Sequence, residues 1–95
     1  MVLLLAIAAC SGGGGSLTSP VTGQVVDVRA TGGLNVESFV VRPARGDPVE
    51  FGVGPLEPGS FPPSHLKEHQ ISGQPVRVFF REQAGRHFAV RLEDG

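Results

Sequence analysis

Two histidines, His65 and His69, stand four residues apart in the segment HLKEH. In a helix this spacing places both imidazoles on one side, a geometry that zinc and copper sites use. His87 is a candidate third ligand from the C-terminal part of the chain, and Glu68 offers a carboxylate. The sequence therefore allows a metal site at His65, His69 and His87.

A structural role for the histidines is the alternative, and we favour it. On a helical wheel His69 lies beside Leu66, so it would line the edge of the core and hydrogen-bond a loop carbonyl. Two histidines at helical spacing are a weak signal when the rest of a coordination sphere is not visible. We therefore expect no cofactor, with Zn or Cu as the alternative.

In the run VRVFFRE near the C-terminus, arginine or phenylalanine occupies every second position from Arg77 to Arg81. Arg77, Phe79 and Arg81 should share the outer face of a hairpin with Arg91. An aromatic ring flanked by arginines is the composition of a base-stacking platform and also of a protein-binding hot spot. An isolated apolar residue on the surface is the plain alternative. We predict that Arg77, Phe79, Arg81 and Arg91 form a partner-binding face, together with a mobile Pro/Gly loop over residues 54–61.

Catalytic patterns are missing from the sequence. Ser60, Ser64 and Ser72 have no His and carboxylate at the spacing of a known hydrolase family. The run SGGGGS does not have the form of a phosphate-binding loop. We therefore expect that the protein is not an enzyme.

Size and composition favour one small β domain. The 95 residues allow a single domain, and 14 Gly with 8 Pro favour short strands and many turns over a helical bundle. Eight basic against nine acidic residues give a net charge of −1, which provides no general attraction to nucleic acid or anionic lipid. The single cysteine, Cys10, excludes an intramolecular disulfide and a zinc site of paired cysteines.

The order of the predicted elements is three strands, a short helix and two strands. Strands are expected at 21–29, 34–42 and 48–53, the helix at 64–72, and a final hairpin at 72–94 with a turn at 83–85. Strict alternation places Phe39 and Val41 on one face and Val36 on the other, and it groups Phe88 and Val90 with Leu92.

This order resembles the OB-fold, a five-stranded Greek-key barrel with one short helix between strands 3 and 4. The resemblance implies an all-β fold in which Leu66 of the helix closes one end of the barrel. An SH3-like or other small barrel is the alternative. OB-folds bind nucleic acid through strands 2 and 3, where the outer positions here are Val36, Ser38, Val40 and Glu50. Without aromatic and basic residues there, a nucleic-acid-binding OB domain is the least favoured function.

The N-terminal segment looks like an export signal. Residues 2–9, VLLLAIAA, form an apolar run that is too short to span a bilayer as a helix. The run Ile7-Ala8-Ala9-Cys10 resembles the lipobox of bacterial lipoproteins, in which the cysteine becomes the first mature residue and carries acyl chains. Only Met1 precedes the run, where this family has Lys or Arg, so we expect the native start to lie upstream.

These observations predict three parts: a signal segment at 1–9, a lipidated Cys10 with a Gly/Ser tether at 10–19, and an OB-like barrel at 20–95. We expect a lipid-anchored protein of the bacterial cell envelope that faces the periplasm or the exterior. Its predicted role is a non-catalytic binding or accessory module for an envelope protein or polymer. The alternatives are a metal-binding envelope protein that uses His65 and His69, and a nucleic-acid-binding domain. The sequence leaves the oligomeric state open.

Overall fold

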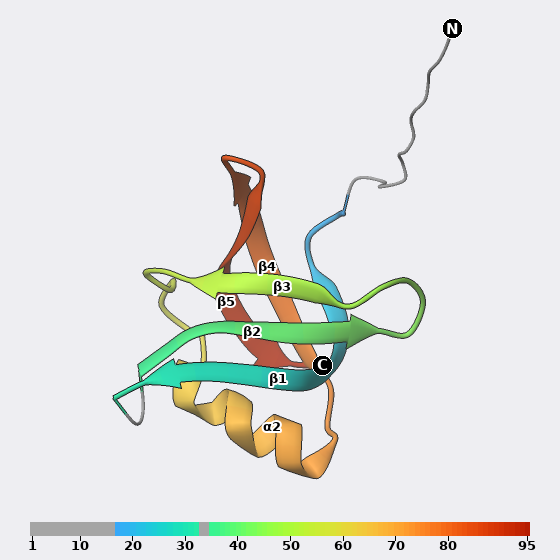
Figure 1. Ribbon diagram of the computed structural model, residues 1–95, viewed down its shortest axis with the longest axis vertical. Helices are drawn as coiled ribbons and strands as arrows, with labels where there is room; N and C mark the ends of the chain where they lie inside the picture. Colours follow the sequence, from blue (N-terminus) through green and yellow to red (C-terminus); the bar gives the residue numbers. More distant parts are fainter. Residues whose placement is uncertain (1–16, 33–34) are drawn as a thin grey trace, which may run out of the picture.

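The computed structural model describes residues 17–32 and 35–95, so the predicted signal segment and Cys10 lie outside the described residues. The described chain forms a closed barrel in the order β1-β2-β3-β5-β4 (Figure 1). A short helix between β3 and β4 completes the all-β, OB-like barrel that the sequence predicted. The elements are β1 Val21–Thr31, β2 Asn35–Pro43, β3 Val49–Val53, η2 Pro63–His65, α2 Leu66–Ser72, β4 Val76–Gln83 and β5 Arg86–Asp94.

Strand β1 closes the barrel because it pairs with two strands. Its first residues pair with β4, and most of its length pairs with β2. Gly23 lies where both pairings overlap, opposite Pro43 on β2 and Val76 on β4. A Cβ at Gly23 would lie 2.3 Å from the carbonyl oxygen of Arg42. The strands can therefore approach this closely only because residue 23 has no side chain.

Three bulges interrupt the alternation of the strands. In the pairing of β1 with β2, Val26 of β1 and Glu37 of β2 have no partner. In the pairing of β4 with β5, Val90 of β5 has no partner. Each extra residue shifts the following side chains to the other face of the sheet.

The bulges correct two sequence-based predictions. Val36, expected on the outer face of β2, is buried, because the bulge at Glu37 returns it to the face of Phe39. In the first half of β5 the residue that faces the core is Ala89, which is 1% exposed, and not Phe88. Strict alternation fails here because Val90 is an extra residue in the pairing with β4. The side chains that precede it in β5 therefore lie on the opposite face from the one that strict alternation predicts.

The core consists of β-branched, leucine and phenylalanine side chains from every strand and from the helix. Phe39 and Phe51 stack at a ring-centroid distance of 5.4 Å, and Phe80 packs against Phe51 from β4 at 5.3 Å. Leu66 is fully buried, which confirms its predicted position at the end of the barrel. The buried apolar residues are Val21, Val25, Val36, Phe39, Val41, Val49, Phe51, Leu66, Val76, Val78, Ala89 and Leu92.

The helix lies across one end of the barrel beside β1 (Figure 1). Pro63 occupies the first helical turn, where its missing N–H costs nothing, and Gly73 ends the helix with a left-handed φ of 77°. Side-chain amides tie the helix to the barrel: Gln70 donates to the carbonyl of Val26, and Gln24 donates to the carbonyl of Gly73. Among the described residues, no helix is long and apolar enough to cross a membrane.

The connection between β3 and η2 is fastened to β5. The amide of Glu57 donates to the carbonyl of Val90 at 2.8 Å, and the amide of Phe61 donates to the carbonyl of Leu92 at 3.0 Å. Ser60 accepts a hydrogen bond from the amide of Leu92 through its hydroxyl at 2.9 Å. The connection thus continues the pairing that β3 begins, and these bonds hold the second half of the predicted Pro/Gly loop at 54–61 against β5, while its mobility stays a prediction.

Candidate functional site

The predicted face of Arg77, Phe79 and Arg91 exists, but its charges are already paired. Phe79 and Arg91 stand opposite each other on β4 and β5, with the guanidinium carbon 5.9 Å from the ring centroid. Arg91 contacts Glu93 at 2.6 Å, and Arg77 reaches the same carboxylate at 3.6 Å. Two of the four predicted binding residues therefore share one carboxylate, which offsets one of their two positive charges.

The fourth predicted residue, Arg81, belongs to a different part of the surface. It is exposed, and its partner across the hairpin is Phe88. Arg86 covers the same ring, with its guanidinium carbon 5.3 Å from the centroid. Within residues 17–32 and 35–95, neither Arg81 nor Arg86 forms an ion pair. Phe88 is thus a half-buried aromatic residue on the outer side of the hairpin, with the guanidinium of Arg86 over its ring.

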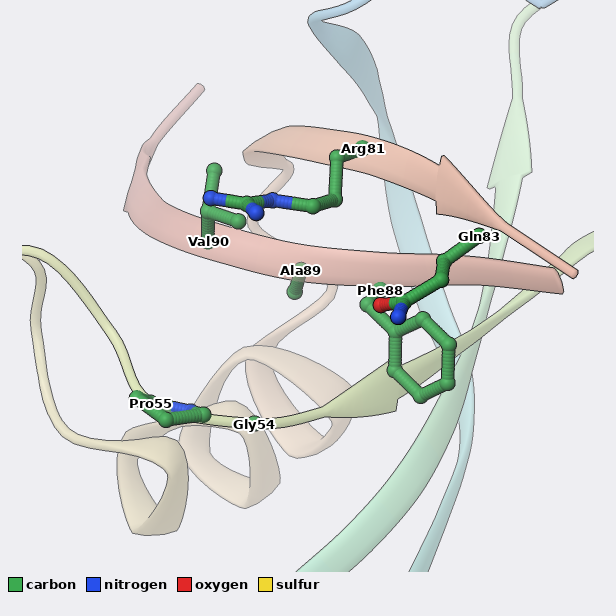
Figure 2. A pocket seen from close by; sticks show the side chains of 7 residues that line it. All are labelled: Gly54, Pro55, Arg81, Gln83, Phe88, Ala89 and Val90. Atoms are coloured by element: carbon green, nitrogen blue, oxygen red, sulfur yellow. The ribbon is translucent and has the colours of Figure 1, made fainter.

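A groove of about 330 Å³ lies between the hairpin and the segment after β3 (Figure 2). This volume falls at the lower end of the usual range for ligand sites. Arg81 and Gln83 contribute from β4, and Figure 2 shows them with the side chains of β5 that share the groove. Its lining residues are Gly54, Pro55, Arg81, Gln83, Phe88, Ala89 and Val90.

Gly52 of β3 makes room for the ring of Phe88. The two residues are partners in the parallel pairing of β3 with β5. A Cβ at Gly52 would lie 2.9 Å from two ring carbons of Phe88, which is closer than van der Waals contact allows. One edge of the ring, Cδ1 and Cε1, therefore lies against the backbone of β3, which fixes the position of the ring beside the groove.

The three histidines occupy two separate places. His87 contacts the rings of Phe51 and Phe80, with centroids 6.2 and 5.2 Å away, and its Nε2 lies 3.8 Å from Glu82. His65 and His69 lie at the other end of the barrel, with ring centroids 4.9 Å apart. The structure therefore does not bring His87 to the pair, and the third group beside them is Asp94.

Donor atoms of His65, His69 and Asp94 all lie within 4.8 Å of one another. The Nε2 atom of His69 is 2.8 Å from Oδ1 of Asp94, and the Nε2 atom of His65 is 3.9 Å from the same oxygen. His69 is 2% exposed, whereas the side chain of Asp94 is 65% exposed. The cluster is therefore anchored in the core on one side and open to solvent on the other.

Sequence reasoning missed Phe88, Arg86 and Asp94. Phe88 was assigned to the core because no residue in the sequence marks the bulge at Val90. Asp94 lies 25 positions after His69, and only the closure of the barrel brings β5 beside the helix. The position of Gly52 opposite Phe88 is the one signal that a register prediction would have offered, since a strand glycine often marks a close approach.

Comparisons of the chain with protein-family models, with curated proteins and with solved structures found no match.

Proposed function

We propose that the protein is a non-catalytic binding module of the bacterial cell envelope that holds an acidic segment of a partner protein in the groove of the β4–β5 hairpin. The observation that carries this proposal is that Phe88 and Arg81 line one groove, while the guanidinium carbon of Arg86 lies 5.3 Å from the centroid of the Phe88 ring. Aromatic and arginine side chains in a desolvated pocket are the usual composition of binding hot spots.

The chemistry of the groove matches an extended acidic peptide. Pro55, Phe88 and Val90 supply an apolar floor, and Arg81 supplies a charged rim. Arg81 presents a planar guanidinium, which pairs with carboxylates through two parallel hydrogen bonds. The Gln83 amide can both donate to and accept from a peptide backbone. In a partner peptide, a carboxylate would pair with Arg81, and a neighbouring apolar side chain would pack on the apolar floor.

Nucleic acid fits the surface less well. On the outer side of β1 to β3, Asp27 and Glu50 hold Arg29, with contacts of 3.6 and 3.9 Å, and Glu37 accepts a hydrogen bond from Thr31. Three carboxylates on the face that OB-folds use for oligonucleotides repel phosphates. This charge pattern favours a protein partner over a nucleic acid.

Membrane anchoring would make a shallow groove effective. The resemblance of residues 7–10 to a lipobox implies acyl chains on Cys10, and the Gly/Ser run at 11–16 is the composition of a flexible tether. Confinement near the membrane raises the local concentration of the groove for a partner in the same layer. Anchoring can therefore compensate for a small contact area.

Photo-crosslinking in the native envelope tests the proposal. A photoreactive residue replaces Gln83 at the groove, and a second version carries it at Glu37 on the distant acidic face. We expect one dominant protein adduct from position 83 and none from position 37. Equal adducts at both positions, or no adduct at position 83, would contradict the proposal. An adduct with a polymer would contradict a protein partner and identify the partner as an envelope polymer.

A matched pair of variants assigns the adduct to the groove. In the position-83 background, Phe88→Ala should reduce the adduct at least about tenfold, since loss of a hot spot costs 2 kcal/mol or more. Phe79→Ala removes the other outward ring and should leave the adduct unchanged. The reverse result would return the binding face to Phe79 and its neighbours.

A further inference from the structure

We propose that His65, His69 and Asp94 form a binding site for a divalent transition-metal ion such as zinc. The site lies where α2 meets the end of β5, and it is independent of the groove on the hairpin. Two imidazoles and one carboxylate are a common ligand set for zinc and for related metals with open coordination positions.

The contacts of the two histidines leave Nε2 of each ring facing the carboxylate. Nδ1 of His69 lies 2.8 Å from the carbonyl oxygen of Gln74, which can only accept, so this Nδ1 donates. Nδ1 of His65 lies 3.2 Å from a carboxylate oxygen of Glu68. Metal-binding histidines almost always donate their second nitrogen to a carbonyl or carboxylate in this way.

A cation between Nε2 of His69 and Oδ1 of Asp94 would stabilise their close contact. A neutral His69 that donates from Nδ1 has a lone pair on Nε2, and this lone pair lies 2.8 Å from Oδ1 of Asp94. Two acceptors at this distance repel each other unless a proton or a metal ion lies between them. A metal ion satisfies both acceptors and also the Nε2 atom of His65, 3.9 Å from the same oxygen.

The distances suit a small metal ion. Tetrahedral zinc with bonds of about 2.0–2.1 Å separates its ligand atoms by roughly 3.3 Å. The separations of 2.8 and 3.9 Å from Asp94 to the two nitrogens lie on either side of this value. His65 and Asp94 have side chains that are 35% and 65% exposed, so they can adjust while the buried His69 stays fixed.

The surroundings hold the ligands and leave one side open. The ring of Phe61 stacks on the buried His69 at 5.3 Å, which restricts rotation of that imidazole, and it packs against the more exposed His65 at 4.7 Å. The amide of Gly95 donates to the carbonyl of Pro75 at 2.9 Å, which fixes the backbone next to Asp94. Three protein ligands leave a fourth position of the metal for water on the solvent side.

Metal titration of the full chain tests the site, with Cys10→Ser to remove the only thiol. Calorimetry with Zn²⁺ measures affinity, and Co²⁺ absorbance reports coordination geometry. We expect one ion per chain, a tetrahedral Co²⁺ spectrum, and amide shifts that centre on residues 65–69 and 94.

Variants at the exposed ligands separate a metal site from a structural ion pair. Asp94→Asn and His65→Gln should each weaken Zn²⁺ binding at least about tenfold, which is the usual lower limit even for losing a residue that only supports a ligand. His87→Gln alters the other histidine–carboxylate contact and should leave the affinity unchanged. Unchanged Zn²⁺ affinity in Asp94→Asn, or no saturable binding by the parent chain, would overturn the proposal and leave a proton between His69 and Asp94.

Discussion

Replacing the buried Gly23 by Ala should destabilise the barrel strongly. The new Cβ would lie 2.3 Å from the carbonyl oxygen of Arg42 and 2.8 Å from Cα of Pro43. Both obstructing atoms belong to the backbone, so no side chain can rotate away. To restore ordinary contact, β1 and β2 must separate by roughly 1 Å, at the residue that also pairs with β4.

The expected cost is about 3 kcal/mol, the upper part of the usual range for overpacking a filled site. In a domain of this size, each kcal/mol lowers the melting temperature by about 4–8 °C, so the shift should be about 12–24 °C. Circular dichroism follows both experiments: urea unfolding measures the loss of unfolding free energy, and thermal unfolding measures the shift in melting temperature. The Cys10→Ser chain is the parent protein.

Gly54→Ala is the matched control. A Cβ at Gly54 meets no atom within 4 Å. Its unfolding free energy should stay within about 0.5 kcal/mol of the parent protein, as for most surface changes. If Gly23→Ala unfolds at the same urea concentration as Gly54→Ala, the close approach of β1 to β2 at this position is refuted.

Three further changes test the other parts of the molecule. Leu66→Ala empties the end of the barrel and should cost about 2–5 kcal/mol of unfolding free energy, measured by urea unfolding; a cost below 1 kcal/mol would show that the helix does not close the barrel. Ser60→Ala removes the acceptor of the Leu92 amide and should cost about 1–2 kcal/mol, with faster hydrogen exchange at that amide; unchanged exchange would contradict the fastened connection. Cys10→Ser should move the protein from the membrane to the soluble fraction, and membrane retention of this variant would exclude acylation as the anchor.

The fold could be predicted because its signals are local. Alternating apolar residues, Gly and Pro turns and the Pro63–Gly73 helix boundaries each follow from a few neighbouring positions. The order of these elements then allowed few topologies. Leu66 could be assigned to the barrel end because it is the one large apolar residue of the helix before Ile71, which is 87% exposed.

The binding groove could not be predicted because it depends on a bulge. Glu37 and Val90 look like ordinary strand residues, and their extra positions are known only from the pairing of two strands. One inserted residue reverses the face of the residues before it, so Phe88 moved outward and Ala89 inward. The metal-site hypothesis failed at His87 for a related reason. His87 and Asp94 stand near opposite ends of β5, about 23 Å apart at 3.3 Å per residue, and only the closed barrel decides which end meets the helix.

The proposed groove has its aromatic residue only if the side chain of residue 88 points outward and that of residue 89 points into the core. Phe88→Cys and Ala89→Cys, each in the Cys10→Ser chain, can be compared by their rates of reaction with a thiol reagent under native conditions. We predict that Cys at the half-buried position 88 reacts at least about 100 times faster than Cys at position 89, which is buried in a stable barrel. Fast reaction at position 89 with protection at position 88 would place Phe88 in the core and remove the proposed binding site.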